Sequence, residues 1–363
     1  MKVSGNFFKR IKTIFSLFLA ALALFCVGTR LPGLLKNSDS AALAAAAFTL
    51  TDGVRRAETE PQPETQASQL LTQPPKQPAA NMIKQAEKTV DKSGYYDSFA
   101  PHEDEEKKAV ASKTITGDGD FTENCFVKNN TELSVDFSSL LHSPLTFSVK
   151  SGVSEVQVLI YHTHTSESYL DESVDYFYES YYPRTQNADF NVTAVGDCIA
   201  NVLESNGVKT LHDVTVHDST YNGAYDRSAQ TAAADMKENP SVKVVLDIHR
   251  DALGTEDCKV KPVFEFEGKT CAQIMILAGC DPDNERGFSN WQNNLSFALK
   301  LQSKAEELYP GMTRPLDFDY FAYNEYLCDG SLLIEVGSDA NSIDEVETTG
   351  ELLGEVLAQV LGA

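Results

Sequence analysis

The chain has 363 residues and a formal net charge of −23, a length that suits one large domain or two smaller ones. The first fifty residues contribute +5 (six Lys or Arg and one Asp), so the remaining 313 residues carry −28. Because nucleic-acid-binding proteins present a basic face to the phosphate backbone, this acidic body argues against nucleic acid as a partner.

The N-terminus has the pattern of a membrane anchor. Residues 1–12 are basic, and Thr13 to Thr29 is a run of 17 residues without a charge. A membrane-spanning helix needs about 20 apolar residues, with a range of about 17–25, and its positive flank stays in the cytoplasm. A cleaved signal peptide is the alternative, although its apolar region usually has about 7–15 residues. We expect a cytoplasmic tail (1–12), a single transmembrane anchor (13–29) and an extracytoplasmic remainder at the cell membrane.

Residues 30–112 have the composition of a tether. The segment is rich in Glu, Gln, Pro, Thr and Lys and has no sustained apolar period. Such a composition cannot bury enough apolar surface to fold on its own. We expect a largely disordered linker that gives a folded domain, residues 113–363, its reach from the membrane.

The pattern from Lys113 onward is that of a folded domain. We expect a strand or hairpin within Phe121–Phe147, with a turn at Asn129-Asn130. From Val156 onward strands and helices alternate, which predicts an α/β fold with a mostly parallel sheet and helices on both faces. The expected strands are Val156–Tyr161, Val208–Leu211, Val242–Ile248, a hairpin of Pro262–Phe266 with Ala272–Leu277, and Ser331–Val336. The expected helices are Asn191–Asn206, Tyr225–Lys237, Asn290–Leu308 and Ser342–Leu361.

Three of the apolar strands deliver residues that bind metals or transfer protons. The stretch VQVLIYHTHTSESY (156–169) supplies His162, His164 and Glu167. The stretch VKVVLDIHR (242–250) supplies His249, and LLIEVGS carries Glu335. Ligands of open α/β sheets bind beyond the carboxyl ends of the strands. We therefore expect one site assembled from distant parts of the chain.

His164, Glu167 and His249 are the candidate metal ligands. Two imidazoles and one carboxylate are a donor set that holds a catalytic Zn²⁺ and leaves a position for water, whose pKa falls to about 7. The alternative is that both histidines only make hydrogen bonds at the edge of the sheet. If the strand continues, His162 faces the same side as His164. It would then approach the metal or orient one of its ligands.

Glu335, Asp247 and Arg250 each have a chemical and a structural interpretation. Glu335 is a general base whose pKa is raised by desolvation, or it pairs with a buried arginine such as Arg250. Asp247 alternates onto the side of His249 and could accept its second ring N–H. Arg250 clamps a carboxylate of the substrate or forms a structural salt bridge.

The stretch HDSTYNGAYDRS (217–228) lies between a predicted strand and a predicted helix. Loops in this position often carry binding residues. His217, Tyr221 and Asn222 are therefore candidates for substrate binding, and an ordinary capped loop is the alternative. The seven cysteines show no CxxC pair and no zinc-finger spacing, and we expect most of them to be unpaired thiols.

Four motifs in one order, YHTHTSESY, HDSTYNGAYDRS, DIHRDA and LLIEVGSDAN, resemble the stage II sporulation protein P family. That family is similar to zinc-dependent N-acetylmuramoyl-L-alanine amidases, and the resemblance covers roughly residues 113–363. It implies a membrane-anchored peptidoglycan hydrolase of forespore engulfment. The enzyme would cleave the N-acetylmuramic acid–L-alanine amide and also stem-peptide cross-links. The resemblance also implies partnership with stage II sporulation proteins D and M.

Carried over by motif, the resemblance implies zinc ligands at His164 and His249 and a catalytic carboxylate at Glu335. Amidases of this type usually take their second ligand from a Glu that opens the first long helix. Here that helix begins Asn191-Val192-Thr193, and Glu167 is the nearest substitute. Arg250 or Tyr221 would position the peptide. A non-catalytic cell-wall-binding scaffold that recruits a partner hydrolase, or a different metallopeptidase on the same fold, are the alternatives.

Overall fold

The computed structural model describes residues 105–117 and 119–363. The predicted tail, the predicted anchor and most of the predicted linker lie outside the described residues. Within the described ranges, no helix has the length and apolarity needed to cross a membrane. The last residues of the predicted linker are described and form a strand, β1 (Lys107–Lys113). The folded part therefore begins earlier than the predicted boundary at 113.

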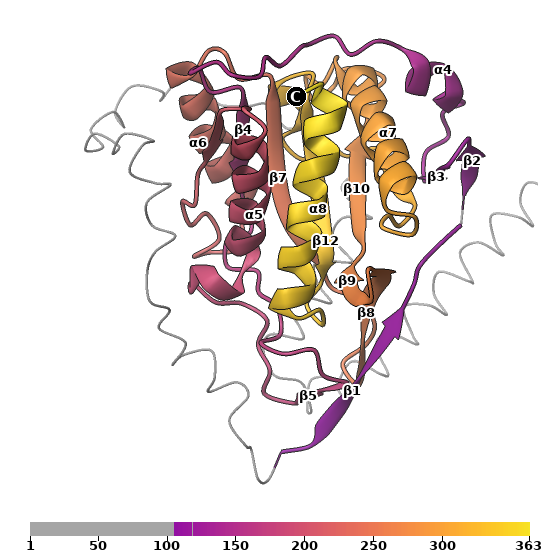
Figure 1. The fold of residues 1–363 in the computed structure, drawn as a ribbon, viewed down its shortest axis with the longest axis vertical. Helices are drawn as coiled ribbons and strands as arrows, with labels where there is room; N and C mark the ends of the chain where they lie inside the picture. Colours follow the sequence, from indigo (N-terminus) through magenta and orange to yellow (C-terminus); the bar gives the residue numbers. More distant parts are fainter. Residues whose placement is uncertain (1–104, 118) are drawn as a thin grey trace, which may run out of the picture. The chain divides into compact units, whose positions relative to one another are not determined.

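The main sheet has eight strands among the described residues (Figure 1). They are β2 (Asp120–Thr122), β3 (Cys125–Asn129), β4 (Val158–Tyr161), β6 (Thr210–His212), β7 (Val244–Asp251), β10 (Ile274–Gly279), β11 (Leu316–Asp319) and β12 (Ser331–Ser338). Their spatial order is β2-β3-β11-β10-β12-β7-β4-β6. The β2/β3 and β10/β12 pairs are antiparallel and the other pairs are parallel.

The α/β prediction is confirmed, but the sheet is mixed and not the mostly parallel sheet that was predicted. The cause lies in β10, which is antiparallel to β12. Parallel neighbours need a long crossover connection. Only Gln273 separates β10 from the preceding strand, so no crossover helix brings β10 into the sheet in the parallel direction.

A second sheet has four strands in the order β5-β1-β8-β9 and lies at the lower end of the view in Figure 1. Its other strands are β5 (Tyr176–Tyr178), β8 (Cys258–Phe266) and β9 (Lys269–Ala272). The predicted hairpin is present as the antiparallel pair β8/β9. Its second strand ends at Ala272, and the rest of the predicted strand belongs to β10 in the main sheet.

All four predicted long helices are present with ends shifted by a residue or so. The helices are α4 (Phe137–His142), α5 (Val192–Ser205), α6 (Ala224–Glu238), α7 (Trp291–Leu308) and α8 (Ile343–Leu361), with short 3-10 turns η3 (Ala188–Phe190) and η4 (Glu325–Leu327). Ser342 and Glu345 form a capping box that begins α8, which satisfies two otherwise unpaired N–H groups. The strand or hairpin expected within Phe121–Phe147 is the β2/β3 pair, and α4 follows it.

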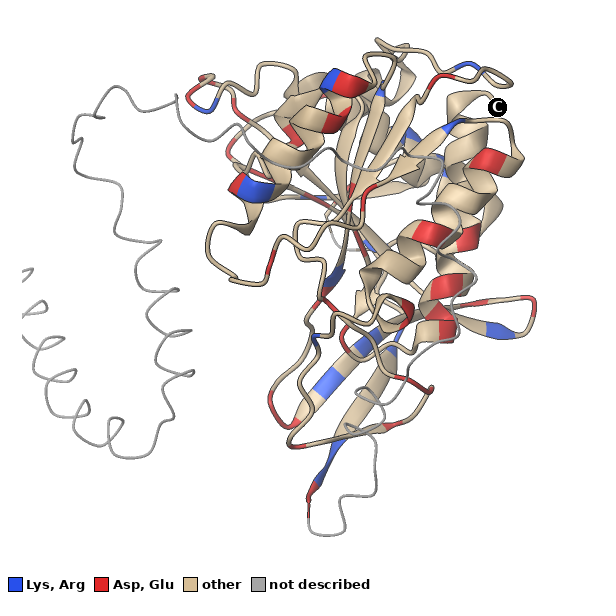
Figure 2. Ribbon diagram, turned by 90° about the vertical axis from the view of Figure 1, so that its left-hand side faces the viewer, with Lys and Arg blue, Asp and Glu red and all other residues tan. Residues whose placement is uncertain are grey.

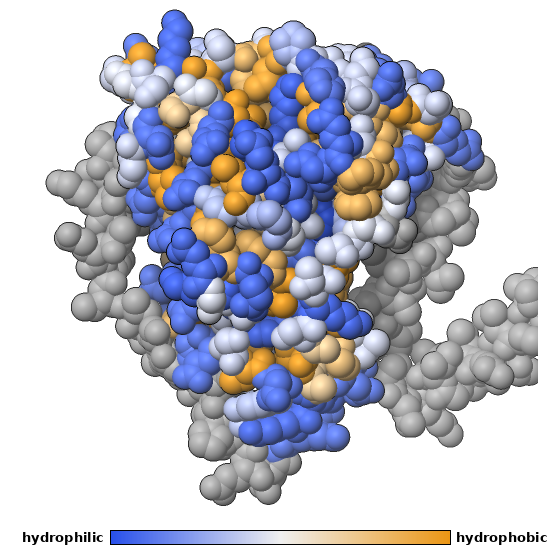
Figure 3. Space-filling view, turned by 45° about the vertical axis from the view of Figure 1, so that its right-hand side comes forward, coloured by the Kyte–Doolittle hydropathy of each residue, from blue (hydrophilic) through white to orange (hydrophobic). Residues whose placement is uncertain are grey.

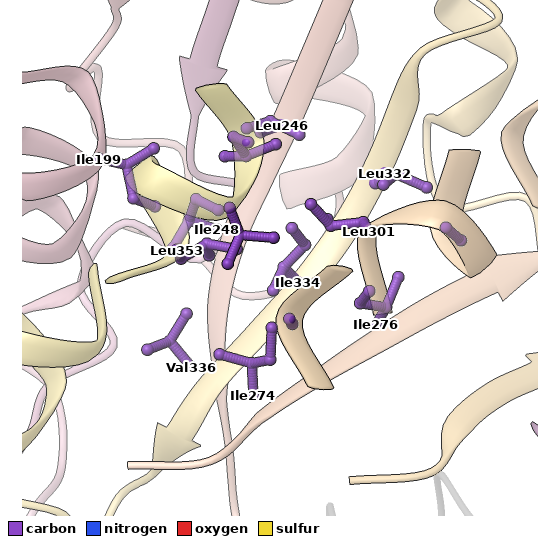
Figure 4. Close-up of a cluster of buried hydrophobic side chains, with 14 of the residues drawn as sticks. Ile199, Leu246, Ile248, Ile274, Ile276, Leu301, Leu332, Ile334, Val336 and Leu353 are labelled. Carbon is purple, nitrogen blue, oxygen red and sulfur yellow. The ribbon is translucent and has the colours of Figure 1, made fainter. Parts of the chain in front are cut away.

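Two apolar clusters lie on opposite faces of the main sheet. Helices α5, α7 and α8 cover one face, and their side chains pack on alternate strand residues such as Leu246, Ile248 and Ile334 (Figure 4). On the other face Leu159, Tyr161 and Val245 pack against α6. Because side chains alternate along a strand, the residues that follow Val245 at every second position also face the α6 side. That face carries the site described below.

The small sheet concentrates several basic residues on its strands (Figure 2). Lys108 pairs with Asp257 at 3.5 Å, and Lys261 with Glu345 at 2.6 Å. Lys259 is bonded to Asp339. These three lysines are therefore neutralised by carboxylates and do not form a free basic surface of the kind that nucleic acid requires.

On the face seen in Figure 3, apolar side chains lie in small groups between hydrophilic ones. The six cysteines of the described ranges are unpaired.

Candidate active site

The register of two parallel strands brings His249 and Glu335 together. His249 of β7 pairs directly with Glu335 of β12. Asp247 lies two residues earlier on β7, on the same face. The register shifts between Glu335 and Ser338, where Gly337 has a φ of +68°. β-Bulges of this kind re-aim neighbouring side chains and are common beside functional sites.

His164 reaches this face because the chain turns after β4. The strand ends at Tyr161, and residues 163–166 form a turn. The imidazole of His164 stacks on Tyr221 at 4.7 Å between ring centres and meets Tyr225 and His249 edge-on at 5.7 and 5.4 Å. The prediction that His162 and His164 share a side is wrong, since it required the strand to continue past Tyr161.

Glu167 is buried at the centre of the charged groups. One carboxylate oxygen lies 3.5 Å from His249 Nδ1 and accepts the Arg250 backbone N–H at 3.3 Å. The other lies 3.4 Å from an Arg184 nitrogen. Burial would raise the pKa of Glu167, but Arg250 and His249 outweigh it and lower the pKa to about 2. The group is therefore a carboxylate at neutral pH.

The first long helix, α5, does not begin with the Glu that the amidase pattern would place there, but Glu167 lies close to its first residues. The Val192 N–H, at the start of α5, donates to the Glu167 backbone oxygen at 2.9 Å. Asn191 caps that helix through its side chain and bridges to Ser168. Glu167 therefore lies beside the start of the first long helix, although it does not belong to it.

His249 lies between two carboxylates. Its Nδ1 faces Glu167, and its Nε2 is 2.9 Å from an Asp247 oxygen, without hydrogen-bond geometry. Burial would lower the pKa of His249, but Asp247 and Glu167 raise it well above the ordinary value. Asp247 is itself held by the Thr163 N–H at 2.8 Å and the Thr163 hydroxyl at 2.6 Å. Asp247 is thus held in place as the negative charge on the far side of the His249 ring.

Glu335 has a buried carboxylate oxygen, Oε2, without a hydrogen-bond partner. Burial raises its pKa to about 8, and Glu167 and Asp251 add to the effect while His249 acts against it. Among the described residues no ion pair joins Glu335 to Arg250. The structure therefore does not support the alternative in which Glu335 pairs with Arg250. A carboxyl group of this kind exchanges a proton near neutral pH.

Arg250 points away from this face and orders a loop. Its guanidinium is buried and donates to the carbonyls of Ser168 at 3.2 Å and Pro183 at 2.7 Å. It also lies 3.9 Å from Glu167. These contacts correct the interpretation of Arg250 as a catalytic clamp for a substrate carboxylate, because its donors are engaged inside the protein.

His162 and His217 are structural in this geometry. His162 Nδ1 bonds the Ile248 carbonyl and its Nε2 bonds His212 Nε2, both at 2.8 Å. Burial and His212 lower the pKa of His162 to about 3. His217 bonds the His162 carbonyl at 2.7 Å and Thr231 at 3.0 Å. Because both ring nitrogens of each are engaged, neither histidine is free to bind a metal or substrate.

Tyr221 and Asn222 lie at the rim of the site. Tyr221 is 56% exposed while one ring face covers His164. Asn222 is exposed, and its carbonyl accepts a hydrogen bond from Arg227 at 3.2 Å. Of the two, Tyr221 contacts the candidate ligands directly, and Asn222 lies outside them.

Arg184 is a site residue that the strand-end pattern did not predict. It pairs with Asp218 at 2.7 Å and with Glu167 at 3.4 Å, and its guanidinium carbon lies 5.5 Å from the centre of the Tyr221 ring. The sequence does hold a signal, because Arg184 is the only Lys or Arg between Lys150 and Lys209. A lone cation among buried carboxylates is expected to pair with them.

The donor set suits a zinc ion in its chemistry. Two ligand atoms of a tetrahedral zinc lie about 3.3 Å apart, close to the 3.5 Å between His249 Nδ1 and Glu167 Oε2. His164 Nδ1 is buried without a partner, and burial lowers the pKa of His164 to about 4, which keeps the ring neutral as a ligand must be. In the described part of the chain, however, no three such groups are already close enough to hold a metal.

The fold and site together define an α/β protein with two histidines and two glutamates gathered at the carboxyl ends of parallel strands. The family model described as Stage II sporulation protein P (SpoIIP) matches residues 56–358. The chain therefore belongs to this family, as the motifs predicted.

The relatives are distant ones. Stage II sporulation protein P of Bacillus subtilis (strain 168) is 26% identical over 215 residues, which cover 56% of this chain and 50% of that protein. The chain thus matches half the length of this curated relative. Among solved structures, the N-acetylmuramyl-L-alanine amidase Ami1 of Mycobacterium smegmatis has 13% identity and a TM-score of 0.34, covering 59% of this chain and 99% of that one. The CwlD amidase of Clostridioides difficile, in complex with the GerS lipoprotein, has 11% identity and a TM-score of 0.33, covering 57% and 98%. Similarity at this level gives no information about activity.

Proposed function

We propose that this protein is a peptidoglycan hydrolase of sporulation that cleaves the amide between N-acetylmuramic acid and L-alanine. Membership of the stage II sporulation protein P family supports the sporulation role. The observation that carries the chemistry is the placement of Glu335, with its elevated pKa, directly beside His249 and Glu167.

We assign Zn²⁺ binding to His164, Glu167 and His249. When bound, the metal would supply a Lewis acid and lower the pKa of a water to about 7. Glu167 provides negative charge, since its pKa is about 2, and His164 provides a neutral ring. Asp247 lies 2.9 Å from the other ring nitrogen of His249, the position from which a carboxylate commonly orients a ligating imidazole.

Glu335 carries the proton in this proposal. Burial raises its pKa to about 8 without a metal; the charge of a bound metal would lower that pKa and leave a carboxylate that accepts a proton near neutral pH. It takes a proton from the attacking water and passes it to the leaving amine of L-alanine. Tyr221 stacks on His164 and borders the path of the peptide.

Three further proposals rest on the family resemblance and the N-terminal sequence. The same site would also cut stem-peptide cross-links. Residues 13–29 would anchor the chain in the cell membrane, with the folded domain outside the cytoplasm. Stage II sporulation proteins D and M would be its partners.

The test is mass spectrometry of purified sacculi digested by the full chain, with and without a chelator. Release of stem peptides with a free L-alanine amine, lost on chelation, is the expected result. Peptide fragments cut only at cross-links would replace the amidase with an endopeptidase. Digestion that a chelator leaves unchanged would refute the zinc assignment, and bound zinc without digestion, even with the partners added, would favour a scaffold.

A further inference from the structure

A row of aromatic rings leads away from the candidate active site. Tyr225 lies nearly parallel to the His249 ring at 6.3 Å, Tyr323 lies 5.9 Å from Tyr225, and Phe321 lies 5.2 Å from Tyr323. We call Tyr225, Tyr323 and Phe321 the aromatic strip. Tyr225 and Tyr323 are half-buried, whereas Phe321 is 49% exposed. The strip therefore connects the buried site to the surface.

The outer part of the strip is held in an unfavourable backbone conformation. Tyr323 has a φ of +39° and Asn324 a φ of +130°. Positive φ at a bulky residue is rare and costs about 1–3 kcal/mol. Such strain persists only where the surrounding structure enforces it, and it gathers at ligand-binding segments.

Three contacts enforce this conformation. The buried Asn324 amide donates to the Tyr225 carbonyl at 3.2 Å and to Ser228 at 3.0 Å. The Glu325 carboxyl accepts the Gly279 N–H at 3.1 Å. Gly279 also permits the close approach of the loop, since a Cβ there would lie 2.0 Å from the Phe321 carbonyl oxygen. Residues 321–325 are thus tied to α6 and to the end of β10, and the two outer rings are presented on a preorganised support.

We propose that the aromatic strip binds sugar rings of the glycan strand, an inference that rests on the proposed function and names which part of the substrate lies there. Pyranose rings have flat, apolar faces with hydroxyl groups at their edges. Tyrosine and phenylalanine match such faces with a large rigid ring, and tyrosine adds a polar edge. The strip continues directly into the site through the Tyr225–His249 contact.

The charge around the strip favours a neutral ligand. The carboxylates that act on Tyr323 include Asp317 and Asp319, and the whole chain carries −23. Arg286, which is bonded to the adjacent Tyr320 carbonyl, is an opposing charge, and Lys128 and Arg314 act on Asp317. N-acetylated sugars are uncharged, whereas stem peptides carry free carboxylates. The net negative charge of the chain therefore disfavours the peptide more than the sugar.

The bond to be cut explains why sugar recognition belongs beside the site. The scissile amide is attached to the muramic acid through its lactyl group, so it lies next to a sugar ring. A ring bound on the strip therefore places the amide near Glu335 and His249. Binding energy from such a non-reacting part of the substrate positions the reacting bond.

The test measures binding of chitohexaose, a neutral peptide-free N-acetylglucosamine oligomer, to the full chain by calorimetry. The variants are Phe321→Ala and Tyr323→Gly; the glycine also suits the positive φ, so loss of the fold is not expected there. Aromatic contacts contribute about 0.5–1.5 kcal/mol, so each variant should weaken binding roughly 3- to 10-fold. The control is Phe121→Ala, which removes an aromatic side chain that is 60% exposed and packs on Phe126 in the β2/β3 hairpin. It should leave binding unchanged.

Binding of a free stem tetrapeptide, measured in parallel, shows whether the aromatic strip recognises sugar or peptide. Unchanged chitohexaose binding in both strip variants would overturn the proposal, as would weaker tetrapeptide binding with chitohexaose binding intact. On sacculi, a raised KM with kcat nearly unchanged would support a positioning role. Strip-dependent chitohexaose binding by a wild-type protein that digests nothing would support the strip and refute the hydrolase. If sacculi are digested but chitohexaose binding and KM are unaltered in the variants, the hydrolase would be supported and the role of the aromatic strip refuted.

Discussion

Glu335 and His249 are direct neighbours on parallel strands, and their protonation is linked. Asp247 and Glu167 hold a proton on His249, while burial holds one on Glu335. The resulting imidazolium supplies the positive charge that neutralises the surrounding carboxylates. A divalent cation bound between His249 and Glu167 would replace that proton, and the same charge would lower the pKa of Glu335. Metal and proton therefore compete for one position in the site.

The first prediction is that Glu335→Gln abolishes hydrolysis while zinc binding remains. The amide has nearly the same shape but cannot shuttle a proton, and general acid–base catalysis contributes typically about 10²–10⁴-fold. Release of stem peptides from sacculi and zinc content by mass spectrometry are the two readouts. Glu267→Gln, in the β8/β9 turn, is the matched control. Full activity in Glu335→Gln would contradict the assignment.

The second prediction concerns stability against pH in the presence of a chelator. The pKa of Glu335 is about 8 in the folded protein against an ordinary 4.5, so the folded state holds the proton more tightly than the unfolded chain. This stabilising contribution is fully present below about pH 4.5 and is lost as the pH rises through about 8. A shift of this size corresponds to at most about 5 kcal/mol.

Glu335→Gln serves as the comparison for that pH dependence, since it cannot titrate. Urea unfolding at pH 5 and pH 8 should show the wild-type protein losing more free energy of unfolding than the variant. His249 contributes a loss of the same sign in both proteins, because its pKa is also raised. Equal losses in the two proteins would show that Glu335 is ionised in the folded state at neutral pH.

The third prediction is that Glu167→Gln loses zinc and destabilises the fold. The change removes the charge opposite Arg250, Arg184 and His249. Removal of one partner of a buried ion pair typically costs about 3–5 kcal/mol. Zinc content after dialysis and urea unfolding measure the two effects. Glu204→Gln, which removes a more exposed partner of Lys209, should change neither, and unaltered zinc in Glu167→Gln would exclude it as a ligand.

The strand-end residues were predictable because burial and alternation are local signals. A continuous apolar run marks β7, and period two places Asp247 and His249 on one face. An apolar run also predicts β12 as a buried strand, and Glu335 lies within that run. The parallel register that makes Glu335 and His249 neighbours depends on long-range pairing, which no local pattern contains.

The incorrect predictions share one physical cause, since each depends on contacts with distant residues. Nothing before His162 shows that β4 ends at Tyr161. Arg250 is committed to the carbonyls of Ser168 and Pro183, which only the folded loop brings near. Strand β1, with the sequence KKAVASK, is too polar to be recognised as a strand until β5 and β8 pair with it.

The fourth prediction tests the histidine pair that joins α5 to the sheet. His162 and His212 meet at 2.8 Å, and His212 Nδ1 contacts Asp197 at 2.8 Å. Gly196 of α5 makes room for them, because a Cβ there would lie 2.4 Å from His212 Nε2 and 3.0 Å from His162 Nε2. Gly196→Ala should therefore lower the free energy of unfolding by about 1–3 kcal/mol, the usual cost of overpacking.

A double-mutant cycle distinguishes this clash from a general effect on the helix. In a His212→Ala background the closest contact of the added Cβ is gone, and His162, whose Nε2 lies 3.0 Å from that Cβ, can shift into the vacated space. Alanine is also intrinsically better than glycine inside a helix by about 1 kcal/mol. Gly196→Ala should then be neutral or stabilising, with a coupling free energy of about 0.5–3 kcal/mol between the two sites. Urea unfolding of the four proteins measures it. A destabilisation of equal size in both backgrounds would show that the histidine pair is not what requires glycine at this position.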